Sequence, residues 1–420
     1  MPHERRPSRF LPRSARPALA SVVAVVLLNA GPVSHSEASD LLAATVGAAD
    51  TGMAAADLAS PRSPAGAQFA NPAGLARFET TINGGLGAAY GTGRVEATFP
   101  AGYEENNSVI ALIPEFAYVK RGQGKWSYAV GMHGTVGTRY DYPKKPSVGV
   151  NHNLFAEVTI MAAPLSVAYR ASERLWVGAQ LMPMFGYFRS HFAIPPYTPE
   201  GVEPLFKPRF KLTGPGITAM GGVSWHATDH ISLALSARPP GKVWMDGSSL
   251  TPTGDRQDTD LNLKIPAEIS TGITFDPLDD WTFAYTLRWV DSSSLGESKV
   301  RFEDTSAFDF AFIPDATDEW RHAIGAEWRW KPTLALRTGI SHADHIVGNR
   351  GVSPLSYDGD DTRLYAGAGW KRGRWTLDCS AVYKFADSRH IDAEAASVFP
   401  GRYRSGAAVL VMFALSRELG

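Results

Sequence analysis

Residues 281–289 read Trp-Thr-Phe-Ala-Tyr-Thr-Leu-Arg-Trp, and this stretch decides the fold. Every odd position carries a large apolar or aromatic side chain, whereas the even positions carry small or polar ones. Because successive side chains of a β-strand point to opposite faces, this alternation predicts a strand with one apolar and one polar face. Such a strand can place its odd positions against lipid and its even positions, Arg288 among them, in a watery or protein-filled interior.

The same alternation recurs along the chain, in residues 231–237, 320–330 and 375–383. Several of these segments begin or end on Trp or Tyr, as an aromatic girdle at the lipid headgroups requires. Short turn clusters alternate with longer polar stretches, which lie at 139–151, 194–211, 246–260, 291–318 and 342–361. This arrangement predicts a transmembrane antiparallel β-barrel. A soluble β-sandwich or repeat array is the alternative, but it would leave much of this apolar face exposed to water.

The composition agrees with many short strands and turns, with 40 Gly, 29 Pro, 11 Trp, 14 Tyr and 20 Phe in 420 residues. A mean hydropathy of -0.15 excludes a multi-helix membrane protein but not a barrel, whose strands need only one apolar face. The formal net charge of -1 gives no sign of a nucleic-acid partner. The single cysteine, Cys379, cannot form an internal disulfide, and we interpret it as a plain strand residue.

The N-terminus has the form of an export signal. Arginines precede an apolar run at 18–28 (ALASVVAVVLL), which is shorter than the ~20 residues that a membrane-spanning helix needs. We therefore predict a cleaved signal peptide at 1–38, although a cut nearer Ala30 is an alternative, and a permanent anchor is a less favoured one. Export without disulfides favours a hydrogen-bonded barrel in the outer membrane of a Gram-negative type cell.

Residues 39–81 differ from the rest, because they are rich in Ala and other small residues and show no strand alternation. Within them Asn71 is a good N-cap and Pro72 a good first helical residue, so a short helical turn is predicted there. We expect 39–81 to be a plug, or hatch, inside the lumen of a barrel formed by 82–420. A flexible periplasmic tail is the alternative.

The run Asn71-Pro72-Ala73-Gly74-Leu75-Ala76 resembles the plug motif of the FadL-type long-chain fatty acid transporters and their relatives that admit aromatic hydrocarbons. Further stretches resemble hairpins of that family, at 211–214, 221–233, 265–273, 319–328, 336–340, 360–363 and 367–370. The resemblance implies an all-β barrel of about 14 strands with a plug in the lumen. It also implies passive uptake of apolar ligands without ATP. One departure is the C-terminus, where residues 416–420 follow the last apolar run.

The expected function is an outer-membrane channel for hydrophobic small molecules, with long-chain fatty acids as the first choice. Uptake of aromatic hydrocarbons is the alternative, and a general porin or adhesin on the same scaffold is another. We expect gating to depend on Asn71, Pro72, Ala73 and Gly74, which would hold the plug and fix its turn. The sequence does not predict the ligand-contacting residues.

No enzyme activity, cofactor or metal is expected. The candidates for a nucleophile elbow, Gly222-Val223-Ser224 and Gly351-Val352-Ser353, lack its second glycine. The pair His342 and His345 lacks an H-E-x-x-H context, so a solvated loop is favoured over a metal site. The expected partners are the hydrophobic ligand, outer-membrane lipid with lipopolysaccharide, and the barrel assembly machinery. We expect no nucleic acid and a monomeric channel.

Overall fold

A computed structural model describes residues 45–97, 103–145, 153–191, 209–250, 255–303, 306, 309–392 and 400–419. The predicted signal peptide at 1–38 and the first part of the predicted plug, 39–44, lie outside these residues. Within the described ranges, no helix combines the length and the apolar character that a membrane span requires.

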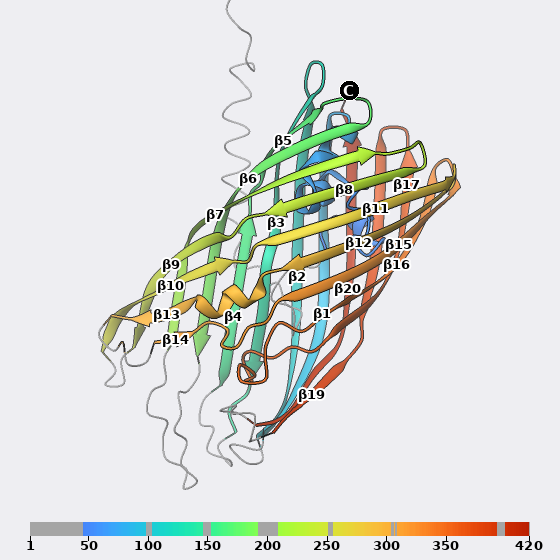
Figure 1. Ribbon diagram of the computed structural model, residues 1–420. Coiled ribbons are helices and arrows are strands. Elements are labelled where there is room, and N and C mark those ends of the chain that lie inside the picture. Colours follow the sequence, from blue (N-terminus) through green and yellow to red (C-terminus); the bar gives the residue numbers. More distant parts are fainter. Residues whose placement is uncertain are drawn as a thin grey trace, which may run out of the picture. The chain divides into compact units, whose positions relative to one another are not determined.

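Strands dominate the chain and form one antiparallel sheet (Figure 1). The first ten are β1 (Thr81–Ala97), β2 (Tyr103–Arg121), β3 (Trp126–Tyr142), β4 (Leu154–Ala162), β5 (Leu165–Arg170), β6 (Leu175–His191), β7 (Arg209–His226), β8 (Ile231–Arg238), β9 (Gly241–Leu250) and β10 (Arg256–Ile265). The others are β11 (Glu268–Leu278), β12 (Trp281–Val290), β13 (Lys299–Phe302), β14 (Phe310–Ala311), β15 (Glu319–Lys331), β16 (Leu334–Ala343), β17 (Asp361–Arg372), β18 (Trp375–Lys384), β19 (Asp387–Ile391) and β20 (Gly401–Glu418).

These segments make a closed barrel of 14 strands, as the family resemblance implied. The sheet closes because β20 pairs with β1 along its length, from Thr81 opposite Glu418 to Ala97 opposite Gly401. Some barrel strands consist of two segments that continue one another, such as β4 with β5 and β10 with β11. Pro164 and Pro266 lie at these two interruptions, where a proline cannot donate to the sheet ladder.

The predicted alternation of faces is confirmed. In β12 the even positions are buried, whereas Phe283 is 44% exposed on the outer face of the sheet. Next to it Trp281 stacks on Trp328 of β15, with ring centroids 5.6 Å apart. The outer face therefore presents the continuous apolar and aromatic surface that lipid contact requires.

The limits predicted for several long loops were wrong. Residues 139–142 belong to β3 and 209–211 to β7, and β9 extends as far as Leu250. Beyond the apolar band the outer face of these strands is polar, with Arg139, Asp141, Arg209 and Lys211, while Tyr140, Tyr142 and Phe210 face the interior. The outward apolar pattern that identifies a membrane strand is therefore lost, although the backbone pairing continues. The C-terminal residues 416–418 likewise continue β20 and pair with β1.

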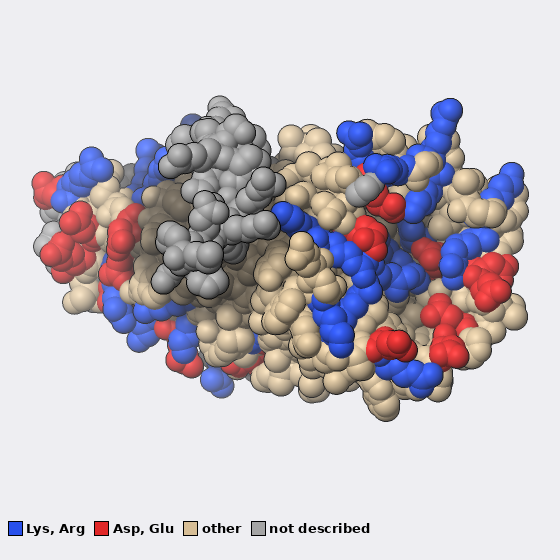
Figure 2. Space-filling model, turned by 90° about the horizontal axis from the view of Figure 1, so that it is seen from above, with Lys and Arg blue, Asp and Glu red and all other residues tan. Residues whose placement is uncertain are grey.

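Charged side chains inside the barrel are paired. Glu268 lies 2.9 Å from Arg238 and 3.3 Å from Arg288, and Arg337 lies 2.7 Å from both Glu327 and Asp378. Pairing offsets the cost of removing these charges from water. On the face seen in Figure 2, Lys and Arg lie interspersed with Asp and Glu, so this face carries no extended surface of a single sign.

Candidate functional site

The N-terminal segment, residues 45–80, is mostly buried and contains three short helices. They are α2 (Ala48–Thr51), α3 (Pro64–Ala70) and the 3₁₀ helix η1 (Pro72–Arg77). The predicted turn is confirmed, because Asn71 is the N-cap of η1 and its side chain accepts from the Ala73 backbone N–H at 3.1 Å. Pro72 follows as the first helical residue, where its fixed φ suits the helix and its missing N–H is not needed.

The Asn71 side chain joins the N-terminal segment to the barrel. Its amide nitrogen donates to Ser224 Oγ at 3.0 Å and to the Val223 carbonyl at 3.3 Å, both in β7. The same nitrogen lies 3.2 Å from the Leu58 carbonyl within the segment. Asn71 is fully buried, so these bonds have no competition from bulk water.

Pro72 and Ala73 lie against a glycine of the barrel wall. A Cβ atom at Gly178 of β6 would stand 2.3 Å from the Ala73 nitrogen and 2.6 Å from the Pro72 oxygen. A Cβ atom at Gly222 of β7 would stand 2.1 Å from Asn71 Oδ1. The two glycines are paired across the β6–β7 ladder, so together they form a flat place on which η1 rests.

Gly74, the fourth predicted residue, faces the N-terminal segment itself. A Cβ atom at this position would lie 2.6 Å from Cγ of Pro61. Asn71, Pro72 and Ala73 thus contact the barrel, whereas Gly74 permits the segment to pack on itself.

Gln68 of α3 makes a second polar connection to the barrel. Its side chain donates to Ser166 Oγ of β5 at 3.0 Å, and its carbonyl accepts from Gln180 of β6 at 2.8 Å. Ser166 in turn donates to Gln180 Oε1 at 3.0 Å. On another side, Thr286 of β12 donates to the Ala56 carbonyl at 2.7 Å. The segment is therefore held by hydrogen bonds to well-separated strands.

Buried carboxyl groups lie inside the N-terminal segment. The Asp50 carboxylate accepts from the Arg62 backbone N–H at 2.8 Å and from the Ser63 hydroxyl, which caps α3. Burial raises the pKa of Asp50 and of Asp57, and the charge of Asp50 raises the pKa of Asp57 further. Burial also lowers the pKa of the Arg77 guanidinium to about 10.

The ladder between β2 and β3 stops partway along these strands. Their pairing runs from Arg121 opposite Ser127 to Phe116 opposite Met132 and goes no further among the described residues. Beyond this point β2 pairs with β1 alone, and β3 pairs with β4 alone. We call residues 103–115 of β2 and 133–142 of β3 the β2–β3 break.

The ends of the β2–β3 break are defined by side chains. At the outer end Asn107 Oδ1 accepts from the Asp141 backbone N–H at 3.2 Å. At the inner end the N-terminal segment approaches, since the Gly47 N–H donates to Glu115 at 2.6 Å and the Phe69 ring meets His133 edge-on at 5.5 Å. The segment thus lies beside the one place where adjoining described strands of the barrel wall lose their backbone bonds over such a length.

Apolar side chains line the interior from this region toward the longer loops. They come from β3, β4, β6, β7, β9, β10 and β13, and include Ile160, Met182, Met184, Phe188, Phe210, Leu212, Met220, Val243, Met245, Leu261, Leu263 and Phe302. Phe188 and Phe210 meet at 5.1 Å. Met side chains are flexible and polarizable, so such a lining can adapt to an apolar guest.

The sequence prediction placed Asn71 to Gly74 correctly at a helical turn but missed the partners of this turn. Ser224 is 153 positions away in the chain, and nothing local indicates that it faces Asn71. The β2–β3 break had a local signal, since Pro114 has no N–H to donate and Gly131 and Gly134 weaken the facing part of β3. The sequence prediction missed the apolar interior, because the inward positions of other strands, such as Arg288 in β12, are polar.

Comparisons with known proteins agree with this geometry. A family model described as outer membrane protein transport protein (OMPP1/FadL/TodX) matches residues 33–191 and 216–415. A comparison with curated proteins found no match.

Among solved structures, a Pseudomonas aeruginosa FadL homologue is similar at TM-score 0.77 and 13% identity, over 91% of this chain and 100% of that one. The Pseudomonas putida toluene transporter TodX is similar at TM-score 0.70 and 16% identity, over 91% of this chain and 100% of that one. The Ralstonia pickettii toluene transporter TbuX is similar at TM-score 0.67 and 15% identity, over 92% of this chain and 99% of that one. At these identities the likeness shows the fold.

Proposed function

Because the chain belongs to the outer membrane transport protein family OMPP1/FadL/TodX, we propose that it admits long-chain fatty acids by passive diffusion. Members of this family are outer-membrane channels for hydrophobic compounds, not enzymes, and they act as monomers. Solved relatives include both a FadL homologue and toluene transporters, so family membership alone does not choose between fatty acids and aromatic hydrocarbons.

The length of the apolar interior favours fatty acids. Along β7 Phe210, Leu212 and Met220 point inward over a span that at about 3.3 Å per residue corresponds to roughly 33 Å. Between them, Val243 of β9 packs beside Gly216 and continues the apolar lining. A chain-shaped ligand can contact such a surface along its whole length, whereas a single aromatic ring would contact only a small part of it. The hydrophobic gain grows with the apolar area that leaves water, so a long acyl chain profits most.

Two neighbouring residues of β6 allow a matched test. Met184 points inward, whereas Phe185 is 53% exposed on the lipid face. We expect Met184→Ser to slow uptake of a saturated long-chain fatty acid roughly tenfold, because a polar hydroxyl replaces apolar contact surface. Phe185→Ser should leave uptake within about twofold. The measurement is uptake of radiolabelled fatty acid into proteoliposomes, with toluene in a parallel series.

The parallel series separates the possible outcomes. Uptake of toluene without uptake of the fatty acid would overturn the fatty acid assignment but keep the channel. Equal effects of the two substitutions would show that the interior lining is not the path.

We further propose that the N-terminal segment acts as a plug whose displacement opens the path. The contacts of Asn71, Gln68 and Ala56 with separate strands support this proposal, because they close the segment against the barrel through individual hydrogen bonds and not through a continuous backbone ladder. Each such bond contributes on the order of 1 kcal/mol, so thermal motion or a bound ligand can release it.

The gate can be tested with a pair of buried asparagines. Asn71 donates to Ser224 across the contact between segment and barrel, whereas Asn83 donates to Ser416 at 3.0 Å within the wall, between β1 and β20. We expect Asn71→Ala to raise ion conductance in planar bilayers and to alter fatty acid uptake. Asn83→Ala should lose a comparable bond and change neither.

Wild-type protein should pass little ion current, since a plugged channel has no open aqueous pore. A large open conductance in the wild type would favour the general porin. If Asn71→Ala has the same ion conductance and the same fatty acid uptake as the wild type, Asn71 is not part of the gate.

A further inference from the structure

The outward face of the barrel carries a dense group of cations near the longer loops. Arg139 of β3, Arg189 of β6 and Lys211 of β7 lie in one row, because Arg139 is paired with Glu157, Glu157 with Arg189, and Arg189 with Lys211. His191 and Arg209 form the next row outward. We call these five residues with Glu157 and Phe155 the basic groove.

The charges of the basic groove do not balance. Glu157 lies 3.2 Å from Arg189 and 3.8 Å from Arg139, and its side chain is only 2% exposed. Asp141 lies 3.1 Å from Arg139. Within the described part of the chain, Arg209 and Lys211 have no carboxylate at salt-bridge distance, so the groove keeps an excess of positive charge.

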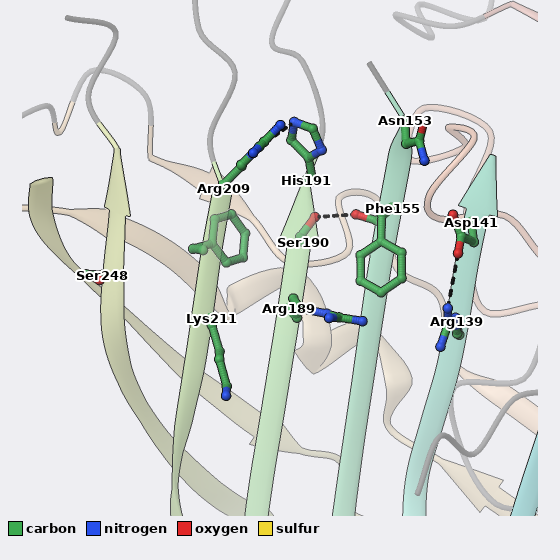
Figure 3. Close-up of a pocket in the computed structure, with 11 residues that line it drawn as sticks. Arg139, Asp141, Asn153, Phe155, Arg189, Ser190, His191, Arg209, Lys211 and Ser248 are labelled. Atoms are coloured by element: carbon green, nitrogen blue, oxygen red, sulfur yellow. Dashed lines mark hydrogen bonds and ion pairs between the residues drawn. The ribbon is translucent and has the colours of Figure 1, made fainter. Parts of the chain in front are cut away.

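The two arginines are held in place by one aromatic ring. The Phe155 ring lies 4.4 Å from the Arg189 guanidinium carbon and 5.2 Å from that of Arg139. Figure 3 shows both arginines beside Phe155, with Lys211 on the neighbouring strand and Arg209 beside His191 above. Arg189 donates from Nη2 to Glu157 at 3.2 Å, and its further N–H groups match the geometry of a phosphate group.

The basic groove lies at the level along the barrel where lipid headgroups are expected. On the same face of β6 lie the exposed apolar Leu181 and Phe185, then Tyr187, then Arg189. Arg189 is therefore about 13 Å beyond Phe185 along the strand, at about 3.3 Å per residue. Tyr187 contacts Lys211, with the ammonium 5.6 Å from the ring centroid. Cations directly past an aromatic position are where a barrel meets anionic headgroups.

The groove is hollow enough for such a group. Arg139, Arg189, His191, Arg209 and Lys211 line a cavity of about 560 Å³ that also includes Ser190 and Ser248. It opens on the outside of the wall, whereas the apolar interior lies on the opposite face of the same strands. The charged side chains of the groove thus lie on the face opposite the proposed path of the transported ligand, although Phe210 borders both the cavity and the apolar interior.

We propose that the basic groove binds the phosphate groups of an outer-leaflet glycolipid of the lipopolysaccharide type. The proposal rests on the outer-membrane location of the family and not on which substrate crosses the channel. Phosphate carries the charge that the groove lacks, and Arg189, Arg209 and Lys211 supply several N–H donors in two neighbouring rows. The acyl chains of the same lipid would lie along Phe185 and Leu181 below.

The test compares two surface pairs in the purified full-length protein. Arg189→Gln with Lys211→Gln removes two charges from the groove. Arg402→Gln with Arg404→Gln removes two outward charges of β20, where Arg94 is already paired with Glu96 at 2.8 Å. The measurement is binding of lipopolysaccharide in detergent micelles, with dephosphorylated lipopolysaccharide and inorganic phosphate as further probes.

We expect the groove pair to weaken lipopolysaccharide binding at least tenfold and the β20 pair to weaken it less than threefold. Dephosphorylated lipopolysaccharide should bind the wild type as weakly as the groove variant binds the native lipid. Lys211→Gln alone, which removes an exposed side chain, should give a smaller loss in the same direction.

Three results would overturn the proposal. They are equal weakening by both pairs, full competition by inorganic phosphate at low millimolar concentration, and equal binding with and without lipid phosphates. Competition by a fatty acid carboxylate alone would instead make the groove part of ligand entry, which also contradicts the proposal. None of these outcomes depends on whether the channel transports fatty acids.

Discussion

Gly178 shows how closely the N-terminal segment approaches the wall. The missing side chain at this position leaves room for the backbone of Pro72 and Ala73, and backbone atoms cannot rotate away as a side chain can. Gly221, across the ladder from Ala179, lies on the other face of the sheet, and a Cβ atom there would meet nothing closer than 3.9 Å. Two glycines in neighbouring strands therefore have opposite constraints.

We expect Gly178→Ala to destabilise the contact between the segment and the barrel by about 1–3 kcal/mol through overpacking. Gly221→Ala should be neutral or slightly stabilising, because alanine loses less backbone entropy than glycine on folding. Hydrogen exchange of residues 64–77 measures the difference. Unchanged protection in Gly178→Ala would mean that η1 can shift without cost.

The residues of the turn at Asn71 show what local sequence can predict. An asparagine followed by a proline favours a capped helical start by its own geometry, and this part of the prediction is confirmed. The bond from Asn71 to Ser224 depends on how a distant strand is placed in the closed barrel. No local pattern carries that information.

At the scale of elements, the Asp358 carboxylate joins the two ends of the longest described loop. The loop between β16 and β17 covers 344–360, and Asp358 accepts from the backbone N–H groups of Ile346 at 2.6 Å and Val347 at 3.2 Å. Arg389 of β19 lies 3.4 Å from the same carboxylate. Burial raises the pKa of Asp358 to about 6 in spite of these partners.

This raised pKa predicts how the loop responds to pH. The folded loop holds a proton more tightly than the opened loop, whose carboxyl has the ordinary pKa of 3.8. The free energy of opening should therefore fall as the pH rises from about 4 to about 6, by up to about 3 kcal/mol, and stay constant above that range. Hydrogen exchange at Ile346 and Val347, corrected for the intrinsic rate, measures it. Asp358→Asn should show no such slope, and a rise of protection with pH in the wild type would contradict the assignment.

The strands were predictable where they face lipid on one side only. Residues 281–289 alternate cleanly because lipid selects one face and the interior the other. Residues 139–142 continue a strand past the membrane, where Arg139 and Asp141 face outward and the outer face no longer needs to be apolar. The sequence therefore predicted the membrane-spanning parts of the strands but not their ends.

For the whole molecule, the question is where an apolar ligand leaves the barrel. An axial exit would take it past the N-terminal segment into water, where each buried CH₂ group loses roughly 0.8 kcal/mol. An exit through the wall would take it directly into lipid. The β2–β3 break is the place for such an exit, because opening it further costs no backbone hydrogen bonds between these strands.

A cross-link across the β2–β3 break tests this route. If the register at Phe116 and Met132 continued, Ile113 would face Thr135, so Ile113→Cys with Thr135→Cys can be joined by a short thiol-reactive linker once Cys379 is replaced by Ser. We expect the linked protein to lose most fatty acid uptake and to regain it when a cleavable linker is cut. A matched pair in the intact part of the ladder, Tyr118→Cys with Val130→Cys, should accept the linker without effect. If linking the break leaves uptake unchanged, the ligand must leave along the axis, and the segment at Asn71 would then have to move far enough to clear the channel.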